Sequence, residues 1–350
     1  MFLSTTDERP NQNDYPQHSA IHENDWHILA AFWHPVAFAS SVGEKPAGVT
    51  LLDVPLVIYR TAAGITVAKD QCPHRGTAVS LGWVEGDQLV CPFHGFRFDG
   101  AGQCAHIPSL AKSGAKIPGT LKLNTFQVEE RYGLVWVCMK ETPLHPLPRW
   151  APLDDPSAYD VVTFQGTWQT SAPRHVENFN DTSHLPWVHA NTFGDRDNIE
   201  DQPYPVDQTD YGLYYERAYR QRLKDENGQV TGHLDTFTRF EFTLPFTSTF
   251  YLENDQGEML YALFDVPSPV SAHQSELFAV GLAKRGTGEE YRQFQARVIE
   301  EDIPIVESQR PIDLPLAPGA EFHVPMDRFA LEYRRALSKR FGLGQRPDCQ

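Results

Sequence analysis

Two short loops, each with a cysteine and a histidine, constrain this chain more than any other feature of its sequence. The first reads Cys72-Pro-His74, the second reads Cys91-Pro-Phe-His94, and a glycine closely follows each. Thiolate sulfur and imidazole nitrogen are ligands that zinc and iron–sulfur centres prefer. Glycine and proline allow the backbone to turn tightly. The pattern therefore predicts that both loops fold around one compact inorganic centre.

The spacing within the loops helps to choose among the possible centres. Structural zinc often takes two cysteines and two histidines, but its paired ligands are usually separated by about two to four residues. Only Pro73 separates Cys72 from His74. A Rieske cluster instead has two thiolates on one iron and two imidazoles on the other. Four unrelated loop residues are the third alternative, which requires Cys and His to coincide twice beside proline and glycine. We favour the cluster.

A second group of potential ligands lies in the middle of the chain. Glu177, Asp181 and His184 are spaced by four and then three residues, which places them on one face of a helix. His189 follows His184 by five residues, about 140° away on an ideal helix. Pro186 ends or distorts a helix just past His184, so His189 can return toward the same centre. We predict a helix end with both imidazoles directed inward.

Two histidines need one carboxylate to complete the facial triad that binds non-haem Fe(II). The late part of the chain offers four candidates: Glu300, Glu301, Asp302 and Glu307. At about 100° per residue, Asp302 lies at the centre of the apolar stripe of a helix expected over Glu289–Ile303. A buried carboxylate is costly unless a proton, a cation or a metal pairs with it. We therefore select Asp302 and assign Glu300 and Glu301 to a solvated face.

The order of apolar segments predicts an α+β fold. Residues 1–25 are polar and lack periodicity, which suits a mobile tail. Residues 26–145 hold short apolar runs between turn residues, which indicates a small antiparallel β domain. A proline-rich connector leads into residues 146–350, where long β segments predict a larger, mostly antiparallel sheet. Three stretches of this second domain are expected to be helical: Pro173–Leu185, Glu289–Ile303 and Pro325–Arg340.

Charge and hydropathy exclude several classes of function. The sequence has 30 Lys and Arg against 46 Asp and Glu, a formal net charge of -16, so nucleic acid is not an expected partner. No apolar stretch approaches the ~18 residues of a membrane span, and the N-terminus does not look like a secretory signal. We therefore expect a cytoplasmic protein without a membrane segment. Dinucleotide-binding and serine-hydrolase motifs are absent from the sequence.

The two motifs together resemble those of the Rieske non-haem iron oxygenases. Residues 72–100, C-P-H-R-G-T and C-P-F-H-G-F-R-F-D-G, resemble the cluster signature of that family, without the extra cysteines that bridge the loops of respiratory Rieske proteins. Residues 177–189 and Asp302 match its mononuclear iron motif, E/D-x3-D-x2-H-x4-H followed later by Asp. The segments F-W-H-P, E-N-F-N-D-T-S-H and E-D-I-P-I-V-E-S-Q are most similar to those of oxidative N- and O-demethylases. One departure is Phe96, where members often have tryptophan.

The resemblance implies two cofactors in two domains. A [2Fe-2S] cluster would lie in a small antiparallel β Rieske domain, and a mononuclear Fe(II) would lie in a catalytic domain of the helix-grip (StAR-related) fold. The cluster ligands would be Cys72, His74, Cys91 and His94. The iron ligands would be His184, His189 and Asp302.

The resemblance gives Asp181 a separate, catalytic role. Asp181 would not bind iron; it would be hydrogen-bonded to iron-bound His184 and to cluster-bound His94 of a neighbouring subunit in a head-to-tail homotrimer. A carboxylate that accepts from both imidazoles fixes their orientation and couples their charge. Electrons would then cross between subunits through Asp181, because the two metal centres of one subunit lie too far apart. The alternative for Asp181 is an ordinary carboxylate on a helix face, and Glu177 would only support the iron site.

We therefore expect the terminal oxygenase of a multi-component monooxygenase. An NAD(P)H-dependent flavin or iron–sulfur reductase, or a ferredoxin, would supply electrons, and O2 would serve to remove an N- or O-methyl group from a small aromatic or heteroaromatic substrate. Ring or methyl hydroxylation by the same metal sites is the alternative. Two hypotheses from other classes remain: a Rieske electron carrier, which needs only residues 26–140, and a ligand-binding module without metal.

Overall fold

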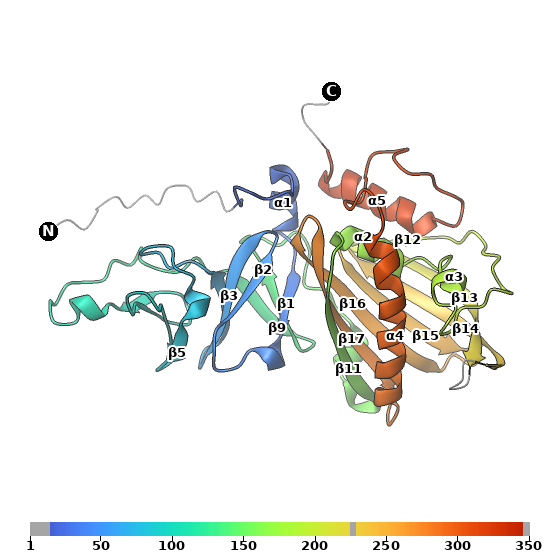
Figure 1. The fold of residues 1–350 in the computed structure, drawn as a ribbon, viewed down its shortest axis with the longest axis horizontal. Coiled ribbons are helices and arrows are strands. Elements are labelled where there is room, and N and C mark those ends of the chain that lie inside the picture. Colours follow the sequence, from blue (N-terminus) through green and yellow to red (C-terminus); the bar gives the residue numbers. More distant parts are fainter. Residues whose placement is uncertain (1–14, 225–228, 346–350) are drawn as a thin grey trace. The chain divides into compact units, whose positions relative to one another are not determined.

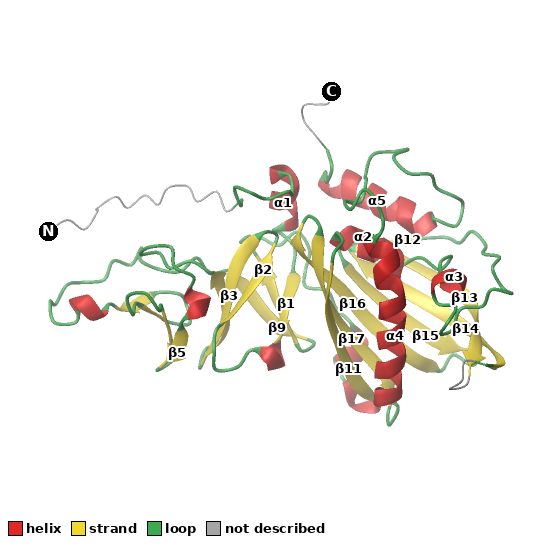
Figure 2. Ribbon diagram, viewed as in Figure 1, coloured by secondary structure: helices red, strands yellow, loops and turns green. Residues whose placement is uncertain are grey.

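The computed structural model describes residues 15–224 and 229–345, and the chain divides into two compact units, Met1–Leu144 and His145–Gln350. Antiparallel sheets dominate both units, as Figures 1 and 2 show, and the long helices belong to the second. The α+β class with antiparallel sheets, expected from the sequence, is confirmed. Among the helices of the described ranges, none combines the length and the apolar character that a membrane span requires.

Three small antiparallel sheets lie in the described part of the first unit, residues 15–144. Their hydrogen-bonded orders are β1-β10-β9, β2-β3-β4 and β5-β6-β7-β8. The strands are β1 (His34–Phe38), β2 (Ala47–Leu51), β3 (Val54–Thr61), β4 (Gly64–Lys69), β5 (Trp83–Glu85), β6 (Gln88–Val90), β7 (Arg97–Phe98), β8 (Cys104–His106), β9 (Gln127–Arg131) and β10 (Leu134–Cys138). Strand β10 is buried at every position because it lies between two neighbours, as its unbroken apolar run indicates.

Helix α1 (Glu23–Leu29) precedes these sheets and buries Trp26 completely. The indole N–H of Trp26 donates to the Leu52 carbonyl at 2.8 Å, which ties the helix to the β2–β3 turn. Helix α1 therefore starts within the segment 1–25, for which the sequence predicts a tail. Residues 1–14 of that segment lie outside the described residues.

The two cysteine–histidine loops connect strands of the first unit. The Cys72 loop runs between β4 and β5, and the Cys91 loop joins β6 to β7. A common apolar core lies beneath both loops and contains Val57, Tyr59, Val79, Leu89 and Phe98. Because each of these side chains is almost fully buried, the core holds both loops at fixed positions.

The second unit is built on one seven-stranded antiparallel sheet. Its hydrogen-bonded order is β11-β17-β16-β15-β14-β13-β12, so every pair except β11-β17 joins consecutive strands. The strands are β11 (Tyr159–Trp168), β12 (Asp207–Gln208), β13 (Gly212–Lys224), β14 (Val230–Thr243), β15 (Thr247–Asn254), β16 (Met259–Ser271) and β17 (Gln274–Lys284). Helix α4 (Gly288–Glu307) runs along one face of this sheet in Figure 1. Its Ile299, Ile303 and Val306 pack with Trp168 and Leu277.

The helix expected over Pro173–Leu185 is wrong in its second half. Helix α2 spans only Ala172–Phe179, and a separate short helix α3 spans Leu185–Val188. Asn180 ends α2, because its side-chain amide donates to the Val176 carbonyl at 2.9 Å. Local side-chain hydrogen bonds of this kind compete with helix continuation, and the amphipathic spacing of the sequence does not reveal them.

The structure confirms the two predicted late helices, with shifted ends. Helix α4 continues four residues past the expected Ile303, to Glu307, and includes Pro304. Helix α5 spans Arg328–Phe341, against the expected Pro325–Arg340, and ends at Gly342 in the left-handed conformation that glycine adopts without strain.

Candidate metal centres

The two cysteine–histidine loops have nearly the same backbone geometry. In each loop the cysteine amide donates to the carbonyl five residues later, and the amide four residues later donates to the cysteine carbonyl, all at 2.8 to 3.0 Å. That fourth residue is Gly76 in the first loop and Gly95 in the second, with φ of 76° and 70°. Glycine adopts this left-handed conformation freely, which explains why both loops contain it at this position.

The thiols of these loops are buried and the imidazoles are exposed. Cys72 and Cys91 are 3% and 1% exposed, whereas His74 and His94 lie at the surface with ring centroids 4.6 Å apart. Phe96 stacks on His74 at 4.6 Å between ring centroids, so the residue that departs from the family pattern supports a histidine of the loop. Two buried sulfurs and two outer nitrogens form the donor set that a Rieske cluster requires.

The protonation of two of these residues follows from their surroundings. Burial, together with the neighbouring Cys91 thiol, raises the pKa of Cys72 to about 11, although a backbone hydrogen bond from His74 opposes this shift. Burial and the charge of His94 lower the pKa of His74, which favours the neutral imidazole that binds metals. Because a thiolate is the ligand form, binding of a cluster or metal to Cys72 would release a proton.

A second candidate centre lies in the other unit, at the two ends of helix α3. His184 immediately precedes α3 and His189 immediately follows it, and Pro186 occupies its first turn, where a missing N–H costs nothing. Asp181 shapes the approach to this helix, since its carboxylate accepts hydrogen bonds from the amides of Ser183 at 3.2 Å and His184 at 2.9 Å. The expectation that Pro186 ends a helix after His184 is therefore wrong, although both imidazoles do converge.

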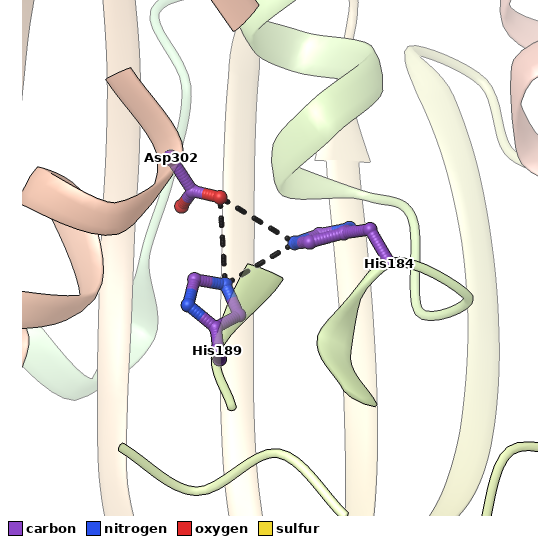
Figure 3. Close-up of side chains that lie close together, drawn as sticks. All are labelled: His184, His189 and Asp302. Atoms are coloured by element: carbon purple, nitrogen blue, oxygen red, sulfur yellow. Dashed lines mark hydrogen bonds and ion pairs between the residues drawn. The ribbon is translucent and has the colours of Figure 1, made fainter. Parts of the chain in front are cut away.

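Figure 3 shows His184, His189 and Asp302 directed toward one point. The two Nε2 atoms are 3.2 Å apart, and Asp302 Oδ1 lies 3.6 Å from His184 Nε2 and 3.4 Å from His189 Nε2. Ligands at right angles around a metal, with bonds of about 2.1 Å, are separated by about 3 Å. The observed triangle is close to that size.

The arrangement of polar atoms in this triangle suits a bound metal ion better than it suits direct hydrogen bonds among the three side chains. Within residues 15–224 and 229–345, Asp302 Oδ1 is buried and has no hydrogen-bond partner. An unpaired buried carboxylate oxygen is costly, and a cation bound between it and the two imidazoles removes that cost. Two imidazoles and one carboxylate are also the ligand set of non-haem Fe(II) sites.

Each imidazole of the triangle is held from behind by a carboxylate. Asp181 Oδ2 lies 3.0 Å from His184 Nδ1, and Glu301 Oε2 lies 2.9 Å from His189 Nδ1. The Thr192 hydroxyl donates to the same oxygen of Glu301 at 2.8 Å. Carboxylates that accept from Nδ1–H leave Nε2 free for a metal and fix the plane of each ring.

The assignment of Glu301 to a solvated face is wrong. Its side chain is 15% exposed, and it binds His189 from helix α4, one residue before Asp302. The sequence carried no local signal for this contact, because α3 and α4 meet only in the folded chain. Glu300 is exposed, as expected.

The pKa values of the two histidines shift in opposite directions, upward at His184 because of neighbouring carboxylates and downward at His189 because of burial. Burial raises the pKa of Asp181, but the hydrogen bond and charge of His184 lower it, and the net shift is downward. Burial lowers the pKa of His184, but Asp181 and Asp302 raise it above its ordinary value. Burial dominates at His189 and lowers its pKa.

Glu177 does not face the triangle. Its carboxylate forms a two-point ion pair with Arg334 of helix α5, with Nε and Nη2 at 2.5 and 2.7 Å from its oxygens. Burial raises the pKa of Glu177, and Arg334 opposes that shift. Arg334 also binds Glu321 at 2.6 Å, and Glu321 binds Arg174 of α2 at 2.7 Å. This network fixes α2, which leads directly into Asp181.

The triangle forms part of the wall of a cavity of about 100 Å³. Eight Phe, Tyr and Trp side chains line it: Trp168, Phe179, Phe193, Tyr219, Phe240, Phe250, Tyr261 and Phe294. A second, wider hollow of about 700 Å³ shares Phe193, Tyr261 and Phe294 with it and therefore adjoins it. A largely apolar cavity with a few polar groups is the usual form of a site for a small organic molecule.

Comparison with known proteins identifies the family. Residues 32–127 match the Rieske [2Fe-2S] domain, and residues 168–341 match the family described as Vanillate O-demethylase oxygenase C-terminal domain. Methylxanthine N1-demethylase NdmA of Pseudomonas putida is 30% identical over 329 residues, which cover 91% of each chain. The chain belongs to the Rieske non-haem iron oxygenases.

Two further comparisons place it among these oxygenases. The solved structure of Pseudomonas putida NdmA superposes with a TM-score of 0.78 at 27% identity, over 91% of this chain and 92% of that one. The oxygenase component of dicamba O-demethylase from Stenotrophomonas maltophilia is 37% identical over 161 residues, 45% of this chain and 46% of its own. Its relatives therefore include oxygenases that perform N- and O-demethylation.

Membership of the family establishes the class of chemistry. Rieske oxygenases are oxidoreductases that use a [2Fe-2S] cluster and a mononuclear iron, and they work with reductase or ferredoxin partners on aromatic substrates. The donor sets described above fit both groups. The carrier and the metal-free binding module are therefore excluded, because the match extends through the catalytic domain.

Proposed function

We propose that this chain is the terminal oxygenase of a multi-component monooxygenase that removes a methyl group from a nitrogen or oxygen of a small aromatic or heteroaromatic substrate. The observation that carries the proposal is the convergence of His184, His189 and Asp302 on an aromatic-lined cavity, in a chain that also carries the Rieske loops. In this proposal those three residues bind Fe(II), and the cluster is bound by Cys72, His74, Cys91 and His94.

The side chains of the cavity prepare the reaction. When bound, the cluster supplies electrons and the iron supplies O2 activation, so that a hydroxylated N- or O-methyl group can collapse to formaldehyde. The aromatic rings stack on a flat substrate and keep bulk water out. Asp181 and Glu301 hold the Nδ1 protons of the two histidines, so that both Nε2 atoms stay directed at the metal.

Asp181 also joins the two centres of different subunits in our proposal. Its side chain remains 34% exposed while it binds His184, so one further donor can reach it. His94 is exposed in the other unit and carries an N–H that can serve as that donor once its other nitrogen binds the cluster. This arrangement requires a homotrimer in which each cluster lies beside the iron of a neighbouring copy. We also propose an NAD(P)H-dependent flavin or iron–sulfur reductase, or a ferredoxin, as donor, and a cytoplasmic location.

Formaldehyde release tests the function directly. Purified holoenzyme, a surrogate reductase and NADH are incubated with a panel of N-methyl and O-methyl aromatic compounds, and formaldehyde and the demethylated ring are quantified. The proposal predicts equal amounts of both products for at least one compound, and none with His184→Ala. Ring-hydroxylated product without formaldehyde across the panel would support hydroxylation instead and contradict the proposal.

A further inference from the structure

A buried polar group lies in the cavity wall outside the metal triangle. His175 of helix α2 and Asp265 of strand β16 pair through Nε2 and Oδ1 at 3.0 Å, and each side chain is 4% exposed. Both residues line the cavity, as does Trp168 at the end of β11. The rings of Trp168 and His175 are 4.4 Å apart between centroids.

Two nitrogen atoms of this group have no hydrogen-bond partner. In the part of the chain that the structure describes, Trp168 Nε1 and His175 Nδ1 are both buried and unpaired. Most buried polar side-chain atoms in proteins are hydrogen-bonded, so two such atoms on adjacent rings require an explanation. Each carries a desolvation penalty in the empty enzyme that a suitable ligand can remove.

The two atoms have complementary hydrogen-bonding character. The indole Nε1–H of Trp168 can only donate. In the tautomer that donates Nε2–H to Asp265, His175 presents Nδ1 as an acceptor. Both rings line the same cavity. Trp168 Nε1 and His175 Nδ1 therefore provide a hydrogen-bond donor and a hydrogen-bond acceptor on adjacent rings.

We propose that Trp168 and the His175–Asp265 pair bind the polar edge of the substrate ring and select rings that carry a carbonyl oxygen next to an N–H. This is the edge of a lactam or cyclic urea: the carbonyl accepts from Trp168, and the N–H donates to His175. The group thereby fixes which methyl position faces the metal triangle in the same cavity. The inference rests on the proposed function, because it names the substrate class of that site.

A pair of small probes tests the proposal without turnover. Binding of 2-pyridone and of N-methyl-2-pyridone to the holoenzyme is measured by calorimetry, since the two differ only in the N–H. The proposal predicts that 2-pyridone binds about tenfold more tightly or better, because the N-methyl compound leaves the buried acceptor unpaired. Equal affinities, or no binding of either probe, would overturn it.

Variants assign the preference to the named residues. The double variant His175→Leu with Asp265→Leu replaces a buried polar pair by apolar side chains, an exchange that is often tolerated. It should bind both pyridones equally, and Trp168→Phe should weaken binding of both. Trp150→Phe, at another fully buried tryptophan that does not line the cavity, is the matched control and should change neither affinity.

The outcomes separate this inference from the proposed function. A double variant that still prefers 2-pyridone over N-methyl-2-pyridone contradicts the assignment of this preference to His175 and Asp265. If that variant does not fold, the affinities of the two probes for the wild-type enzyme still test the proposal. Formaldehyde release from other aromatic compounds together with equal pyridone affinities would reject the lactam subsite and leave demethylation standing. Tight, selective binding of 2-pyridone without any formaldehyde from the panel would support the lactam subsite and reject demethylation.

Discussion

Replacing Glu301 by glutamine tests whether the carboxylate behind His189 helps to hold iron. Glu301 Oε2 lies 2.9 Å from His189 Nδ1 and also accepts from Thr192, so the carboxylate is fixed in place and in turn fixes the imidazole. Glutamine has almost the same shape and keeps an oxygen that can accept from Nδ1–H, but it carries no charge. The substitution therefore removes the electrostatic support of the ligand and little else.

The expected loss of iron affinity follows from this geometry. Changes to groups that orient a metal-bound histidine typically cost about 10- to 100-fold in affinity, or roughly 1.4 to 2.7 kcal/mol. Glu301→Gln should lower the affinity for iron about tenfold, because one hydrogen bond to His189 remains. Glu301→Ala should lie near 100-fold, because Nδ1–H of a residue whose side chain is 2% exposed then loses its acceptor.

Ferrous iron affinity is measured by anaerobic equilibrium dialysis against a graded chelator, with the visible absorption of the cluster as an internal standard for intact protein. Glu300→Gln is the matched control, because the same change is made one residue away at an exposed position. It should bind iron as the wild type does. If Glu301→Gln and Glu301→Ala both retain wild-type affinity, the carboxylate does not support His189 and our description of the centre is wrong.

Three other predictions address the electron path, the helix network and acid stability. Asp181→Asn should abolish formaldehyde release while leaving the cluster spectrum unchanged, and retained turnover would contradict the bridging role. Arg334→Met should lower the free energy of unfolding of the second unit by roughly 3–5 kcal/mol in chemical denaturation, since it leaves the buried Glu177 carboxylate without its cation. Arg335→Met, at a side chain that is 53% exposed, is the control and should lower the free energy of unfolding far less. Similar losses in both variants would refute the network. Burial lowers the pKa of His34 from 6.5 to about 4, so the unfolded chain binds a proton that the folded chain excludes, and stability falls as pH drops below about 6.5. His34→Gln should therefore reduce the loss of unfolding free energy between pH 7 and pH 5 by about 2 kcal/mol, and equal pH profiles for both proteins would count against this origin.

The parts of the site that could be predicted from the sequence are those encoded over short distances. The Cys72 and Cys91 loops are recognisable because each contains its ligands, its proline and its glycine within a few residues. The sequence singles out Asp302 because helical periodicity is a local property and α4 is a long helix. The similarity to a known family then indicates which cofactors and which class of reaction these patterns serve.

The parts that failed depend on contacts between distant segments or on side chains that bind the backbone. Asn180 and Asp181 interrupt the expected helix through such local hydrogen bonds, so Asp181 and His184 do not share a helix face with Glu177. Glu301 meets His189 only when α3 and α4 pack together. Spacing rules for a single helix cannot detect either effect.

The polar group of the cavity shows the same limit. Trp168, His175 and Asp265 come from a strand, a helix and another strand, and no spacing in the sequence relates Asp265 to the other two. Their significance depends on burial and on missing partners, which are properties of the folded chain alone.

Mixing two inactive variants tests the central claim most directly. A cluster-deficient variant, Cys91→Ser, and an iron-deficient variant, His184→Ala, are each expected to release no formaldehyde. If the chain forms the proposed homotrimer and electrons pass from the cluster of one copy to the iron of its neighbour, trimers reassembled from both variants contain a cluster beside an intact iron site. They should then recover a measurable fraction of wild-type turnover. Reassembled trimers of confirmed mixed composition that remain inactive, while reassembled wild type is active, would contradict the account.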